Sequence, residues 1–148
     1  ETSLYEYSQS FGKNKTSLIK YNYRRHIFYT LIATVIFALG SIIIGPKIYS
    51  IWTNNKYELS YFLILLIVFD SFFSILKNSI IIIIKSVNRF FKAIVIDALV
   101  SILILLISYY YLSLGYSFLS FFIIALIGSF ISFIIFTYFS LKFYYKLK

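Results

Sequence analysis

Four long apolar stretches, separated by short polar segments, set the pattern of this 148-residue chain. A helix rising ~1.5 Å per residue could cross a hydrocarbon core of about 30 Å within each stretch. The runs are uninterrupted, which excludes an outer-membrane barrel, because barrel strands alternate over about 10 residues. We predict an all-α membrane protein with four transmembrane helices at about 27–51, 59–85, 92–112 and 118–142.

The second stretch carries two charges inside its apolar sequence. Asp70 lies near its middle, and Lys77 follows about two turns later. A charge at this depth costs roughly 2.5 kcal/mol or more, so such residues normally face other helices or a watery cavity. Polar contacts between helices and a transport pathway are therefore both open interpretations. The same helical stripe includes Ser74 and Ile81, with Ser71 and Asn78 at its edge.

The third stretch adds an acid, Asp97, about one turn from its start. Counting ~1.5 Å per residue from the cytoplasmic boundary places Lys77 about 12 Å deep, Asp97 about 7 Å deep and Asp70 about 22 Å deep. These depths predict an ion pair between Lys77 and Asp97. A pair between Lys77 and Asp70 is harder to form.

The chain divides into a polar, basic segment at residues 1–26 and a transmembrane region at residues 27–148. In the first segment, Ser3 and Glu6 have the spacing of a capping box, and Gly12 is placed to end the short helix that it would start.

Small residues and a proline predict local helix geometry in two of the spans. Gly45-Pro46 should break or kink the first span, leaving residues 47–52 as a short helix in the membrane interface. Gly128 and Ser132 form a small-xxx-small pair, which would let a neighbouring helix approach the fourth span closely.

The basic residues predict the orientation. All but three of the 14 lysines and arginines lie in residues 1–26, in the loop at 85–92 or in the carboxy-terminal tail. The positive-inside rule therefore places both ends in the cytoplasm. Basic residues interleaved with tyrosines also occur in nucleic-acid-binding proteins, but the adjoining apolar helix favours membrane lipid as the partner and no nucleic acid.

The composition leaves few residues for catalysis or metal binding. There is no cysteine, and a lone histidine, His26, is too little for a metal site, which needs several ligands. Only Asp70 and Asp97, of five acids, lie within predicted spans, and at different depths. Because P-loop, GxGxxG, HExxH and GxSxG motifs are also absent, we expect no enzyme, no cofactor and no metal.

Three segments carry a resemblance to a known family. They are the polar TSLYEYSQSFGKNK before a span, FALGSIIIGPKIYSIWT around the Gly-Pro, and the basic loop at 85–92. In this order they resemble the carboxy-terminal lobe of bacterial lipid-linked oligosaccharide flippases. These are the polysaccharide (O-antigen) transporters of the multidrug/oligosaccharidyl-lipid/polysaccharide exporter superfamily.

The resemblance implies that the chain is part of a helical-bundle lobe in a larger transporter of the cytoplasmic (inner) membrane. Such a transporter has two lobes around a central cavity and is driven by an ion gradient. Its substrate would be a lipid-linked oligosaccharide, an O-antigen or capsule repeat unit, and its partners the remaining helices of the parent protein. Lys77 is the position assigned to a cationic cavity, with Asp70 and Asp97 as further candidates for the substrate pathway.

Two alternatives remain open. One is a small four-span accessory membrane protein of glycan or lipid-sugar metabolism, similar to the GtrA type. The other is a multidrug exporter of the same superfamily. The sequence contains no methionine, which together with the long polar start favours a piece of a longer protein.

Overall fold

The computed structural model describes residues 2–13, 16–57, 59–86 and 91–146. Every regular element within these ranges is a helix, which confirms the predicted all-α architecture. Four helical stretches, with α3 and α4 counted as one, are long and apolar enough to cross a membrane, so the chain is a multi-pass membrane protein. The helices are α1 (Thr2–Gly12), α2 (Thr16–Trp52), α3 (Tyr61–Ile80), α4 (Ile82–Lys85), α5 (Phe91–Ser113) and α6 (Phe118–Lys146).

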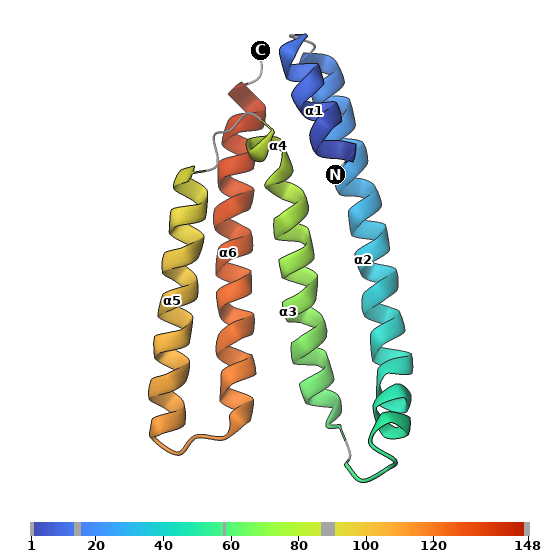
Figure 1. The fold of residues 1–148 in the computed structure, drawn as a ribbon, viewed down its shortest axis with the longest axis vertical. Coiled ribbons are helices and arrows are strands. Elements are labelled where there is room, and N and C mark those ends of the chain that lie inside the picture. The colour runs from blue at the N-terminus through green and yellow to red at the C-terminus, as the bar shows by residue number, and fades with distance from the viewer. Residues whose placement is uncertain (1, 14–15, 58, 87–90, 147–148) are drawn as a thin grey trace.

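The four described spans lie side by side in a row (Figure 1). Helix α3 contacts α2 on one side and α6 on the other, and α6 in turn contacts α5. The order across the row is therefore α2, α3, α6, α5, with α2 and α5 at its edges. Figure 1 also shows α1, α4 and the last turn of α6 gathered at one end, with both hairpin turns at the opposite end.

The bounds of the helices agree with those of the predicted spans to within a few residues, except at α2. This helix starts at Thr16, so the end of the polar segment continues directly into the first span. It also runs through Pro46 to Trp52, and the predicted separate interface helix at residues 47–52 is wrong. A proline lacks only one N–H group, whereas an interrupted helix in lipid would leave several backbone groups unbonded.

The two hairpin turns use residues that tolerate a left-handed backbone. Asn54 and Asn55, between α2 and α3, have φ values of 51° and 58°, and Gly115, between α5 and α6, has a φ of 82°. Asparagine and glycine are the residues that most readily adopt this conformation. These turns set α3 antiparallel to α2, and α6 antiparallel to α5 (Figure 1).

The most enclosed cluster of side chains lies where α1, α2, α4 and α6 meet. Ile19 and Ile83 are fully buried there, and Tyr7 and Phe136 are only 1% exposed. Helix α1 ends at Gly12 as predicted, turns back along α2 and also contacts α4. It begins at Thr2, one residue before Ser3. The predicted capping bonds of Ser3 involve a side chain that the structure does not describe. Helix α1 therefore packs at the end of the helices where α4 and the last turn of α6 also lie (Figure 1).

Tyr7 tests how α1 is held. Its side chain is buried, but its hydroxyl has no hydrogen-bond partner among the described residues. We expect Tyr7→Phe to keep or slightly strengthen the docking of α1, because it removes an unpaired polar atom. Tyr7→Ala should instead weaken it by about 3 kcal/mol, because it leaves a cavity. Hydrogen exchange of α1 in detergent measures both effects, and equal losses in the two variants would contradict this account.

The same side chain gives α1 a pH dependence. Burial raises the pKa of Tyr7, with nearby Tyr23 and Glu6 adding to the increase and Arg25 opposing it. The fold therefore favours the neutral phenol. The stabilisation that buried Tyr7 gives to the docking of α1 is fully present below the ordinary tyrosine pKa of about 10, and it is lost as the pH rises above that value. Protection of α1 should fall above pH 10 in the unmodified chain and fall less in Tyr7→Phe.

Candidate functional site

Helices α3 and α6 run in the same direction and share a polar interface. The Ser129 hydroxyl on α6 donates to the Asp70 carboxylate on α3, and the Ser140 hydroxyl donates to the Ile80 carbonyl. The partners are 59 residues apart in the first pair and 60 in the second. This nearly constant offset means that the two parallel helices stay in register over three turns, so one face of α3 is directed at α6.

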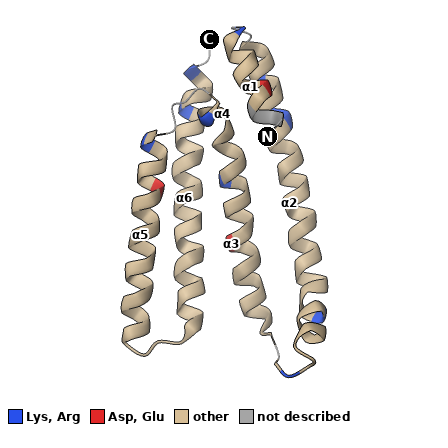
Figure 2. Ribbon diagram, viewed as in Figure 1, with Lys and Arg blue, Asp and Glu red and all other residues tan. Residues whose placement is uncertain are grey.

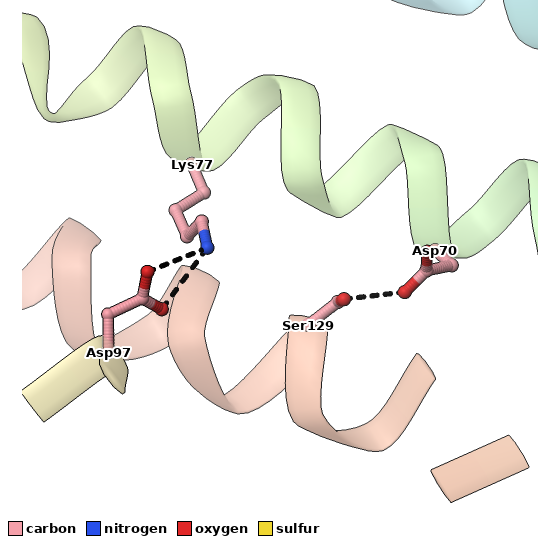
Figure 3. Close-up of polar contacts among 4 residues, drawn as sticks. All are labelled: Asp70, Lys77, Asp97 and Ser129. Atoms are coloured by element: carbon pink, nitrogen blue, oxygen red, sulfur yellow. Dashed lines mark hydrogen bonds and ion pairs between the residues drawn. The ribbon is translucent and has the colours of Figure 1, made fainter. Parts of the chain in front are cut away.

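Lys77 lies on this face and reaches past α6 to α5. Its ammonium donates to both carboxylate oxygens of Asp97, each at 3.1 Å (Figure 3). The ammonium is also 5.7 Å from the centre of the Phe136 ring on α6, a distance that allows a cation–π contact. The predicted Lys77–Asp97 ion pair is therefore confirmed, and it joins two helices on either side of α6.

The ion pair is partly buried. The side chains of Lys77 and Asp97 are 19% and 28% exposed. Pairing removes the net charge from this depth, which is how charged residues in transmembrane helices are usually accommodated.

Asp70 has a different partner. Its carboxylate accepts a hydrogen bond of 2.5 Å from Ser129, and Figure 3 shows the two side chains pointing toward each other well away from Lys77. Between the two polar contacts, Phe73 packs on α6, with ring centres 5.0 Å from Phe130 and 5.6 Å from Phe133. The weaker expectation of an Asp70–Lys77 pair is not met, because Lys77 pairs with Asp97 and Asp70 accepts from Ser129.

Ser71, Asn78 and Ile81 of the predicted stripe lie elsewhere. Ser71 lines a cavity of about 330 Å³ between α2 and α3, together with Ser41 and Trp52. Asn78 is exposed, and Ile81 is buried in the cluster near α1. The stripe therefore divides between the α2 side, the α6 side and the open surface.

The end of α3 holds a side-chain hydrogen-bond site that sequence reasoning missed. The Ile80 carbonyl accepts from the Ser140 hydroxyl at 2.9 Å and from the Tyr23 hydroxyl at 3.4 Å. The N–H of Ile84 bonds instead to the Ile81 carbonyl, so the helix is interrupted between α3 and α4. Side chains that enter the backbone ladder are a recognised cause of such breaks. Three spans meet at this carbonyl.

Ser129 and Phe136 were also missed as partners of the two charges. They are seven residues apart on α6 and so lie on one face, which the sequence does show. The sequence lacked a signal that α6 would lie between α3 and α5. In the described part of the chain, no group of three or more histidine or acidic residues is placed to hold a metal ion.

Comparisons with known protein families, with curated proteins and with solved structures found no match.

Proposed function

We propose that the chain is part of an integral membrane transporter that flips a lipid-linked oligosaccharide across the cytoplasmic (inner) membrane. The observation that carries this proposal is the partly exposed lysine at membrane depth, held by Asp97. Two of the three ammonium N–H donors are bonded to Asp97, and the third can donate to a substrate phosphate without breaking the ion pair. A pyrophosphate-linked glycan offers the anion that such a bond requires.

The open row of helices supports a larger assembly. Apolar side chains at its edge helices are broadly exposed, including Ile36 at 66% and Leu105 at 62%. In a membrane these faces contact lipid or further helices. A single row has no opposite wall to enclose a sugar headgroup, so the proposal requires additional helices from the parent protein.

The test is to delete the parent gene in its host and locate the lipid-linked oligosaccharide. If the proposal is correct, the oligosaccharide accumulates in the cytoplasmic leaflet, and export returns when the gene is restored. Unchanged export in the deletion strain would overturn the proposal. A multidrug exporter would instead leave glycan export intact and make the deletion strain sensitive to added drugs.

The proposed orientation gives a separate prediction. Because the chain lacks cysteine, single cysteines can report topology without background. With both ends in the cytoplasm, Asn55→Cys should react with an impermeant maleimide added to intact cells, whereas Lys146→Cys should react only after the cells are opened. The reverse pattern would overturn the orientation. Position 89, in the predicted inner loop, lies outside the described residues.

A small accessory membrane protein is the second candidate, and one observation favours it. The charges deep within the spans find partners within the chain itself, Lys77 with Asp97 and Asp70 with Ser129. Reconstitution separates the two candidates. Under the transporter proposal, the 148 residues alone should not move a fluorescent lipid-pyrophosphate sugar between leaflets of a vesicle, and robust movement would favour the self-contained protein.

A further inference from the structure

A basic groove lies between the start of α5 and the end of α6, apart from the Lys77–Asp97 pair. Its volume is about 510 Å³, and three exposed lysines line it, Lys92 from α5 and Lys142 and Lys146 from α6. None of its described lining residues is acidic. Figure 2 shows the basic residues of these two helices at the same end of the row. The remaining lining residues are apolar: Ile84, Phe91, Ala93, Phe139 and Phe143.

The lysines alone would have an ordinary explanation. Cations near the carboxy-terminal end of a helix interact favourably with its dipole, and basic residues mark the cytoplasmic side of membrane proteins. Neither effect requires a hollow between the helices. Here the lysines surround an apolar cavity with buried Ala93 and Ile84 at its base. Charge and cavity together match an amphiphile with an anionic head.

The ammonium groups have no acidic partner among the described residues. The one ion pair in the described part of the chain is Lys77–Asp97. The Lys142 ammonium lies 5.7 Å from the Tyr138 ring, which carries no net charge. Three uncompensated cations close together repel one another, so an anion between them would be stabilised. At the end of the spans the available anion is a phospholipid headgroup.

We propose that this groove binds an anionic phospholipid with two phosphates, of the diphosphatidylglycerol class. The phosphates lie among Lys92, Lys142 and Lys146, and an acyl chain runs along Phe139 and Phe143. Two phosphates suit three lysines better than one, because more of the positive charge is neutralised. The inference does not depend on what the protein transports, so it can fail or hold independently of the transport proposal.

The test uses the purified full chain in detergent with diphosphatidylglycerol, phosphatidylglycerol or phosphatidylcholine added, followed by native mass spectrometry. We expect retention of diphosphatidylglycerol over phosphatidylcholine. The triple variant Lys92→Gln/Lys142→Gln/Lys146→Gln should lose affinity for diphosphatidylglycerol by roughly a hundredfold. Each of the three lysines contributes a similar share of the electrostatic attraction to an anionic headgroup. All three side chains are exposed, so the fold should survive.

A matched control removes the same charge elsewhere at this end of the row. Lys13→Gln/Lys20→Gln/Lys85→Gln changes three lysines that do not line the groove and should retain the lipid. Equal losses in both triple variants would overturn the site, as would equal retention of diphosphatidylglycerol and phosphatidylcholine by the unmodified chain.

Two further arms separate a lipid from a soluble anion and locate the acyl chain. Millimolar inorganic phosphate should leave the bound lipid in place, and complete displacement would make this a phosphate site instead. A diphosphatidylglycerol with a photoreactive acyl chain should label the segment containing Phe139 and Phe143. Labelling confined to other spans would overturn the assigned position.

Discussion

Lys77→Ala is expected to lower the amount of folded protein in the membrane several-fold. Asp97 would keep its charge at membrane depth without the ammonium that now donates to both of its oxygens at 3.1 Å. An unpaired acid there costs roughly 2.5 kcal/mol, enough to change cellular abundance several-fold. Fluorescence-detected gel filtration of solubilised membranes measures the folded fraction. Lys47→Ala is the matched control, because it removes an exposed lysine near the far end of α2.

The double variant Lys77→Ala/Asp97→Ala should recover that abundance, because it removes both charges together. Lys77→Arg should retain most of it, since a guanidinium also pairs with a carboxylate. If the double variant remained as scarce as Lys77→Ala, the loss would not arise from a stranded acid. The geometry in Figure 3 would then not be what holds α5 against the row.

Export measured on the same variants separates a pathway from a scaffold. If Lys77 contacts the pyrophosphate during transport, the double variant in the parent protein should be abundant but unable to export glycan. The Lys77→Arg variant should export part of the glycan, because binding of the anionic pyrophosphate depends more on the positive charge than on the shape of the side chain. Full export by the abundant double variant would remove Lys77 from the substrate pathway and leave it only a structural role.

The sequence was sufficient to predict the elements and one long-range contact. Span positions follow from the lengths of the apolar runs, because lipid forces each run to bond its backbone internally. The Lys77–Asp97 pair followed from depth, since two opposite charges at similar levels in a membrane have strong reason to meet. Neither prediction required knowing which helices are neighbours.

The partners of Asp70 and Ile80 depended on that missing knowledge. Ser129 and Ser140 are two of many serines in apolar sequence, and they matter only because α6 lies beside α3. Nothing local distinguishes this order from others with the same hairpins. The predicted separate helix at residues 47–52 was wrong for a different reason. The loss of one backbone N–H bond at Pro46 had to be weighed against the several unbonded backbone groups that a broken helix would leave in lipid.

Gly128→Leu is expected to separate α5 from α6. A Cβ atom at Gly128 would lie 1.8 Å from Ile104 Cδ1 and 2.5 Å from its Cγ1, so even alanine requires the isoleucine to move. Overpacking of this kind typically lowers the free energy of unfolding by about 1–3 kcal/mol, and leucine should cost more than alanine. Gly40→Ala on α2 is the control, because nothing lies within 4 Å of its added Cβ. The thermal unfolding temperature in detergent should be lower for Gly128→Leu than for Gly128→Ala. That of Gly40→Ala should be close to that of the unmodified chain.

The effect should extend to the ion pair, because Ile104 and Asp97 are two turns apart on the same face of α5. Pushing α5 away at Ile104 withdraws the Asp97 carboxylate from Lys77. Gly128→Leu and Asp97→Ala should therefore be less than additive, since each disrupts the same contact. Ile104→Ala should rescue Gly128→Leu by opening space for the new side chain. Full additivity with Asp97→Ala, together with no rescue by Ile104→Ala, would show that the close approach at Gly128 does not position the ion pair.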